Sequence, residues 1–174
     1  MDKLFWGFFR LFLNFNLNFD VHTLNILPAW LGYILLMQGA KSLRHESELF
    51  KIPCPWCIAA AAYTFVLWVL DIIAFTPLGW INWLLEIIAV FAKLYITYLL
   101  IRAIADVEPR RSVDLRSKHL KNVWWVVAVT SIISVALEMA VLQFISNLVG
   151  FVAGICLLVA VHNTRKLYHQ LIGM

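Results

Sequence analysis

Five apolar stretches, each long enough to cross a lipid bilayer, constrain this chain more than any other feature of its sequence. A helix needs about 20 largely apolar residues, with a range of about 17–25, to cross the hydrocarbon core of a bilayer. The stretches lie at residues 26–42, 55–75, 80–101, 123–144 and 148–164. The pattern predicts an all-α fold: an integral membrane bundle of five transmembrane helices within residues 26–174, preceded by a separate segment at residues 1–25.

The composition agrees with a chain whose solvent is lipid. Of its 174 residues, 63% are hydrophobic and 14% are charged, and the mean hydropathy is +0.83. A soluble globular domain carries roughly 25% charged residues, so this chain could not cover its apolar surface in water. The net charge of +4 does not predict nucleic-acid binding, because the basic residues stand in the gaps between apolar stretches.

The distribution of Lys and Arg predicts the orientation of the bundle. Cytoplasmic loops of membrane proteins carry an excess of basic residues. Eleven of the fourteen basic residues fall in two gaps and the tail, which alternate along the chain with gaps that have none. This pattern predicts an N-terminus outside and a C-terminus in the cytoplasm. The eleven residues are Lys41, Arg44, Lys51, Arg102, Arg110, Arg111, Arg116, Lys118, Lys121, Arg165 and Lys166.

The first 25 residues do not match a span. The apolar stretch from Leu4 to Leu13 is too short, and Asn14, Asn16 and Asn18 alternate with Phe and Leu after it. The composition favours an amphipathic segment that lies in the outer membrane interface. The alternative is that these residues lengthen the first span, with a bend at Pro28.

The sequence LNILPAWLGYILLMQG, at residues 24–39, resembles the first span of small uncharacterised polytopic membrane proteins of Gram-positive bacteria. The resemblance covers residues 15–43. It implies a multi-pass protein of a bacterial plasma membrane and implies no activity.

Four ionisable side chains fall within the predicted spans: Asp71, Glu86, Lys93 and Glu138. Each costs about 2.5–3.5 kcal/mol if it faces lipid. They are expected to face the interior of the bundle, and the helical period places other polar residues on the same faces. One face of each of three spans is polar. These faces carry Cys57, Thr64 and Asp71 in the second span, Asn82, Glu86, Lys93 and Thr97 in the third, and Thr130, Ser131, Ser134 and Glu138 in the fourth.

The depths of the charges suggest one site. At a rise of 1.5 Å per residue, the three carboxylates lie within roughly 12 Å of the outer surface, with Lys93 about two turns below Glu86. We expect a site open to the outside for a cation, a proton or a small solute. Lys93 could instead pair with Glu86 or Glu138 only to hold the helices in register, or a partner subunit could complete the pairing. The candidate binding residues are Asp71, Glu86, Lys93, Glu138, Asn82, Thr97, Thr64 and Ser134.

A second hypothesis rests on Cys54 and Cys57, because a Cys-x-x-Cys pair at a helix N-terminus favours thiolate formation and redox chemistry. The pair resembles the thiols of membrane disulfide-generating enzymes, the vitamin K epoxide reductase and quinone-linked oxidase families. Those enzymes relay electrons to a second pair, whereas only Cys156 remains here, and the predicted orientation places the pair in a reducing compartment. Inert cysteines are the simpler interpretation, and a zinc site with His45, His119 or His162 is a third.

The function that the sequence favours is therefore a non-enzymatic one: a small transporter, a channel or an accessory subunit with a polar interior. The alternatives are a membrane thiol oxidoreductase, and a structural or immunity-type protein that sequesters a peptide or lipid through residues 1–19. No cofactor is indicated, and no Ser/His/Asp arrangement, metalloprotease motif or phosphate loop occurs.

Small residues predict close helix contacts. Gly32 and Gly39 lie on one face of the first span, and Gly150 and Gly154 lie on one face of the fifth. The expected partners are membrane lipids. The second pair predicts packing within the monomer or, alternatively, a homodimer seam or a contact in a larger membrane complex.

Overall fold

The computed structural model describes the backbone of residues 1–12, 16–19, 22–25, 28–73, 79–111, 115–136 and 140–172. Side chains are described for these residues with several exceptions. The exceptions are residues 16–19, 22–25, 71, 79, 80, 82, 134–136, 140–150, 169, 171 and 172.

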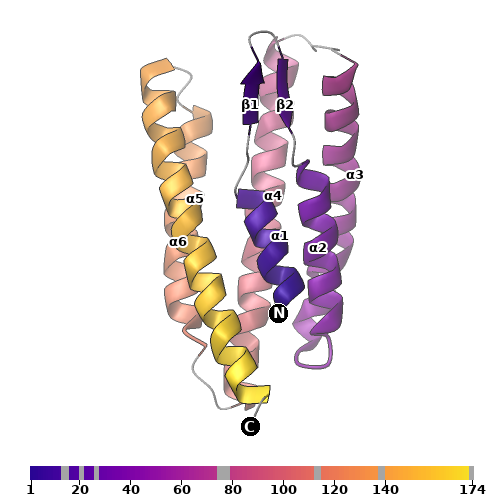
Figure 1. Cartoon of the computed structure of the whole chain (residues 1–174), viewed down its shortest axis with the longest axis vertical. Helices are drawn as coiled ribbons and strands as arrows, with labels where there is room; N and C mark the ends of the chain where they lie inside the picture. The colour runs from indigo at the N-terminus through magenta and orange to yellow at the C-terminus, as the bar shows by residue number, and fades with distance from the viewer. Residues whose placement is uncertain are drawn as a thin grey trace.

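Six α-helices form a ring in which each helix packs against the next one in the chain, and the last packs against the first (Figure 1). The short 3-10 helix η1 joins α2 to α3 and also packs against α4. The described residues are almost entirely helical, as the sequence predicts, with one added β-hairpin. The elements are α1 (Asp2–Phe12), β1 (Asn16–Phe19), β2 (His22–Asn25), α2 (Ala29–Ser42), η1 (Glu48–Lys51), α3 (Pro53–Ile72), α4 (Gly79–Arg111), α5 (Ser117–Ala136) and α6 (Ala140–Ile172).

In place of a separate segment at residues 1–25, the structure shows α1 packed against α2 and α6, and the interfacial position of residues 1–25 stays a prediction. The apolar face of α1 is buried against α2. The contact is close because α2 has glycines there: a Cβ atom on Gly39 would lie 2.7 Å from the backbone nitrogen of Leu4, and one on Gly32 would lie 3.4 Å from the carbonyl oxygen of Gly7. The predicted close approach through Gly32 and Gly39 is confirmed.

The hairpin was not predicted, although its sequence carries the signal of a strand. β1 pairs with β2 in antiparallel register from Asn16 opposite Asn25 to Phe19 opposite His22. Polar and apolar residues alternate from Asn14 to Phe19, and this period of two is typical of a strand. The hairpin lies at the end of the bundle opposite the last residues of the chain (Figure 1).

The start of α1 and the last turns of α6 lie at the same end of the bundle. Asp2 Oδ1 is 2.5 Å from Arg165 Nε, and the Arg165 guanidinium carbon is 5.4 Å from the centroid of the Phe5 ring. The two ends of the chain thus approach each other, whereas the sequence analysis predicts them on opposite sides of a membrane. The chain runs up through α1 and β1 and returns through β2 and α2, and neither α1 nor β1 is long enough to register as a span.

Five helices coincide with the five predicted apolar stretches, but their ends differ. The turn predicted at Ser146 and Asn147 is wrong, because both residues lie within α6. α4 continues ten residues past its predicted end and includes Pro109 in its last turn. The predicted outer turn at Pro77 falls outside the described residues.

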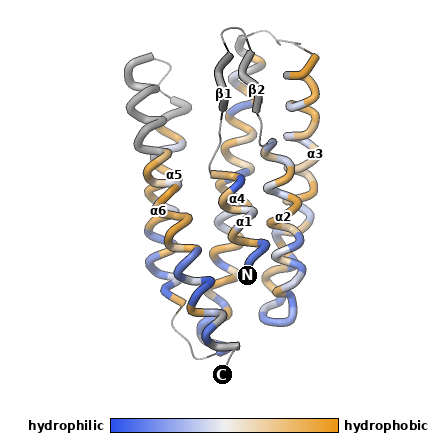
Figure 2. Tube along the Cα trace, in the orientation of Figure 1, coloured by the Kyte–Doolittle hydropathy of each residue, from blue (hydrophilic) through white to orange (hydrophobic). Residues whose placement is uncertain are grey.

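Among the described side chains, those of α3 and α4 are packed tightly at one end of the ring only. The buried side chains of α3 and α4 lie in residues 53–60 and 94–107, and no described side chain in residues 61–73 or 81–93 is buried. We call residues 61–73 and 81–93 the open half of the ring. The closed half comprises α1, η1 and residues 94–111 of α4. The two ends of the ring are called the open end and the closed end accordingly. Figure 2 shows that hydrophilic residues concentrate at the closed end.

Candidate functional site

One stripe along α4 faces the interior of the ring and changes from buried to exposed along its length. The stripe runs through Glu86, Val90, Lys93, Thr97 and Leu100, which are spaced three or four residues apart and so share a helix face. Leu100 and Thr97 are 0% exposed. Lys93 and Val90 are half-buried, and Glu86 is exposed.

The end of α1 explains where the stripe opens. Phe12 is the last residue of α1, and the centroid of its ring lies 5.2 Å from Lys93 Nζ. Phe12 also lies beside α6, where a Cβ atom on Gly154 would be 3.6 Å from Phe12 Cβ. As a member of the ring, α1 therefore covers the stripe up to the level of Lys93, where its last residue Phe12 lies, and does not extend beyond that level.

Thr97 lies one helical turn after Lys93 on the stripe and is buried. Its hydroxyl donates to the carbonyl oxygen of Lys93, 2.8 Å away, and accepts a hydrogen bond from Trp124 Nε1 at 3.0 Å. The second bond ties α4 to α5. Because both of its bonds are made within the protein, Thr97 holds the stripe in place and does not present a free hydroxyl.

The structure brings only some of the predicted binding residues together. Glu86, Lys93 and Thr97 lie on one stripe, as predicted, but Lys93 and Glu86 do not form the ion pair proposed as an alternative. Thr64 donates to the carbonyl oxygen of Ala60 in its own helix. The side chains of the remaining four predicted residues are outside the described set. These four are Asp71, Asn82, Ser134 and Glu138.

The cysteine pair lies in the packed core at the start of α3. Cys54 and Cys57 are 3% and 0% exposed, and the Cys54 thiol donates to the carbonyl oxygen of Phe50 at 3.3 Å. All three cysteines are free, and only Cys156 is exposed. Reactive cysteines are partly exposed in electropositive surroundings, so this geometry favours the inert interpretation. Among the described residues, no three His, Cys, Asp or Glu side chains gather in a way that could hold a metal ion.

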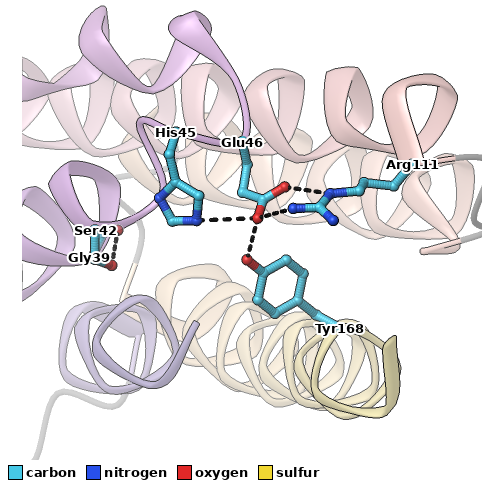
Figure 3. Close-up of polar contacts among 6 residues, drawn as sticks. All are labelled: Gly39, Ser42, His45, Glu46, Arg111 and Tyr168. Atoms are coloured by element: carbon cyan, nitrogen blue, oxygen red, sulfur yellow. Dashed lines mark hydrogen bonds and ion pairs between the residues drawn. The ribbon is translucent and has the colours of Figure 1, made fainter. Parts of the chain in front are cut away.

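A polar cluster that the sequence analysis missed lies at the closed end (Figure 3). Glu46, in the turn before η1, accepts two hydrogen bonds from Arg111, at 2.8 and 2.7 Å. Its Oε1 also accepts a bond from the Tyr168 hydroxyl at 3.0 Å and lies 3.1 Å from His45 Nε2. These contacts join the turn to the ends of α4 and α6. No local sequence signal identifies Glu46, because its partners lie 65 and 122 residues away.

The electrostatics of this cluster follow from its hydrogen bonds. The bonds from Arg111 lower the pKa of Glu46 below its usual value, against the opposing effect of burial. Burial and the neighbouring carboxylate raise the pKa of Tyr168 to about 12. The cluster is therefore arranged around an ionised Glu46 and a neutral Tyr168.

Two further polar contacts strengthen the closed end. Ser47 donates to Asp106 Oδ2 at 2.6 Å, and Arg110 donates to the same oxygen at 2.8 Å. Glu108 accepts from both the backbone nitrogen and the hydroxyl of Ser117 and so caps the start of α5. The predicted cytoplasmic loops are thus linked to one another by side chains and do not only carry charge.

Two helices within the described residues are long and apolar enough to cross a membrane. The first is Glu48–Leu70, which comprises η1 and most of α3, and the second is Trp83–Arg111 of α4. Their mean hydropathies are 1.6 and 2.0. Only 22% and 33% of their most apolar windows are buried in the protein. Comparison with known proteins found no match, whether among family models, curated proteins or solved structures.

Proposed function

We propose that this chain is a multi-pass integral membrane protein that binds a small charged solute on the stripe from Glu86 to Lys93, as a transporter or as an accessory subunit of a larger membrane complex. Lys93 carries the proposal. It lies halfway along an apolar helix, faces the ring interior and contacts an aromatic ring, and no acidic side chain of the described set pairs with it. An ionisable residue at such a position marks a functional site more often than not.

Embedding in a membrane is supported by the exposure of the two apolar helices. A core helix of a soluble protein would bury most of its apolar residues, whereas the second half of α3 and the first half of α4 expose many of theirs. The exposed side chains include Phe65, Val66, Ile72, Ile73, Leu84, Ile88 and Phe91. Acyl chains would cover such a surface, and water would not.

The orientation follows from the basic residues of the closed end. The positive-inside rule assigns this end to the cytoplasm, and the start of α1 would then be cytoplasmic as well, together with the last turns of α6. α1 contributes about 16 Å of helix and β1 about 13 Å of strand. Together they approach the roughly 30 Å of the hydrocarbon core.

The hairpin supports a polar opening on the outer side. An open two-stranded sheet leaves backbone groups without partners, and such backbone is tolerated at membrane depth only inside protein or beside water. In the proposed orientation the hairpin continues the α1–α2 pair past Phe12, above Lys93. The ammonium group at the bottom of this opening favours a solute that carries an anionic group.

The proposal is tested by cysteine accessibility in a Cys156→Ser background, which removes the exposed native thiol. Glu86→Cys, Val90→Cys and Leu100→Cys are labelled from the outside of intact cells with membrane-impermeant methanethiosulfonates. We expect the rate to fall from position 86 to position 90 and to be negligible at position 100. An anionic reagent should react faster than a cationic one at position 90, and Lys93→Gln should remove that preference.

Two results would contradict the proposal. Labelling of position 86 by lipid-soluble maleimides alone would place the stripe in acyl chains. Equal rates for anionic and cationic reagents at position 90, unchanged by Lys93→Gln, would show that Lys93 does not select a solute. The thiol-oxidoreductase alternative is not proposed, because both sulfur atoms of the pair are buried.

A further inference from the structure

The outer face between α3 and α4 carries a groove that is separate from the ring interior. Its volume is about 520 Å³. Small side chains at its centre, Ala59 and Ala60 on α3 and Ala92 on α4, keep the two helices from filling the space between them. Larger side chains that line it, among them Ile88 and Phe91, are 45% and 57% exposed.

Specific contacts close both ends of the groove. At the open end, the Tyr63 hydroxyl donates to the carbonyl oxygen of Leu85 at 2.8 Å. At the closed end, the Trp56 and Tyr95 rings meet edge to face with centroids 5.2 Å apart. Ten residues of α4 separate Leu85 from Tyr95, about 15 Å, which is half of the roughly 30 Å hydrocarbon core. The groove has the length of one leaflet.

The groove is narrow and open along one side. A volume of about 520 Å³ over a length of about 15 Å has room for an extended hydrocarbon chain lying within it. A helix, about 10 Å in diameter, would lie over the groove and not inside it.

A basic side chain stands just beyond the closed end of the groove. Arg102 follows Tyr95 by seven residues, two helical turns, and so lies on the same face of α4. Its side chain is exposed. Among the described residues it forms no ion pair, whereas Lys51, on η1 nearby, is paired with Glu48 at 2.6 Å. A guanidinium at this depth would meet lipid phosphates.

We propose that this groove binds one anionic phospholipid of the cytoplasmic leaflet, with an acyl chain between Ala59 and Ala92 and the phosphate at Arg102. The site depends on the proposed membrane embedding but is independent of the solute site at Lys93. A second groove, of about 350 Å³ between α2 and α3, is lined by Cys57, Ala62 and other apolar residues. Because it is smaller and lies on the other side of α3, it provides a steric control for substitutions in the first groove.

The test is native mass spectrometry of the detergent-solubilised full chain titrated with phosphatidylglycerol or phosphatidylcholine. We expect phosphatidylglycerol to bind more tightly. Arg102→Gln should weaken that binding about fivefold, the effect of one basic residue at an anionic surface, whereas Arg44→Gln, an exposed arginine at the same end, should not. Ala59→Leu should abolish the binding of phosphatidylglycerol, because the larger side chain fills the groove. Ala62→Leu, three residues further along α3 and in the second groove, should preserve it.

The outcomes separate this inference from the proposed function. Phosphatidylglycerol binding unchanged by both Arg102→Gln and Ala59→Leu would overturn the lipid site even if the chain is embedded. A dimer that Ala59→Leu dissociates would place a second copy of the chain in the groove and also overturn it. Release of the chain from cell membranes by alkaline carbonate would instead refute the membrane embedding on which both proposals rest. If the chain stays in the membrane, the cysteine variants test the solute site, and the Arg102 and Ala59 variants test the lipid site.

Discussion

The two halves of α4 belong to different environments, although apolar residues predominate in both. From residue 94 onward the helix is packed by η1 and α5, and its last turns are held by charged side chains. From residue 81 to 93 it has no buried side chain among those described. Apolar character therefore does not decide packing in this chain. The short elements α1 and η1 do, because they reach only one half of the ring.

The strongest test of this comparison is a bulky residue at the α1–α2 contact. Gly39→Leu should prevent α1 from packing, because even a Cβ atom would lie 2.7 Å from the backbone of Leu4. We expect loss of folded protein, or a large fall in Tm measured by differential scanning fluorimetry in detergent. Gly154→Ala is the control, since its Cβ would make only an ordinary contact at 3.6 Å. A similar loss in both variants would contradict the role given to α1.

The same substitution in the two halves of α4 compares them directly. Leu100 is 0% exposed and Leu84 is 46% exposed. Leu100→Ala should leave a cavity and cost about 3 kcal/mol, whereas Leu84→Ala should cost less than about 0.5 kcal/mol. Equilibrium unfolding in detergent measures both. Equal costs would show that the open half is packed in solution.

The next largest effect is expected from removing the Glu46 carboxylate, which should destabilise the closed end. Glu46→Ala removes the acceptor that the hydrogen bonds of Arg111 and Tyr168 share, and we expect a loss of about 2 kcal/mol. Glu48→Gln, at an exposed ion pair with Lys51, should leave Tm unchanged. If the two variants behave alike, the Glu46 cluster does not hold the closed end together.

Thr97→Val should have a smaller effect of about 1 kcal/mol, because it removes the acceptor of the Trp124 N–H while preserving the shape of the side chain. Thr64→Val is the matched control, since Thr64 bonds only within its own helix. The difference in Tm between the two variants measures the link between α4 and α5. No difference would show that Trp124 finds another acceptor.

The smallest expected effect is a pH dependence from Glu46. Its pKa is lowered in the folded protein, so its stabilising contribution is complete above the usual carboxyl value of about 4.5 and is lost as the pH falls through the folded value. Tm should therefore decline more steeply below pH 4.5 in the wild type than in Glu46→Ala. Parallel curves would contradict this assignment.

The helical spans could be predicted from the sequence because hydropathy over 20 residues is a local property. The contacts that close the ring could not. Glu46 and Tyr168 meet across 122 residues, and nothing near either residue identifies the other. The packing of α1 into the bundle could not be predicted for a different reason: an 11-residue helix followed by a 4-residue strand falls below any window suited to a span.

Of the predicted site, the helical period placed Glu86, Lys93 and Thr97 correctly on one face, because three residues of one helix need no tertiary information. Their different exposure could not be foreseen, since it depends on where α1 ends. The position of Phe12 beside Lys93 required a contact between residues 81 positions apart in the sequence. Lys93 and Glu86 form no ion pair, because two turns of helix separate them, and the other half of that alternative, a pair with Glu138, lies outside the described residues.

The contact between α1 and α6 has a consequence for biosynthesis. α1 is synthesised before the other helices and α6 after them, so the pairing of Asp2 with Arg165 can form only after α6 has been made. Until then α1 packs mainly against α2, and the ring is not closed. A nascent chain stalled before α6 would thus expose the surface of α1 that α6 covers, and quality-control proteases would meet it in that state.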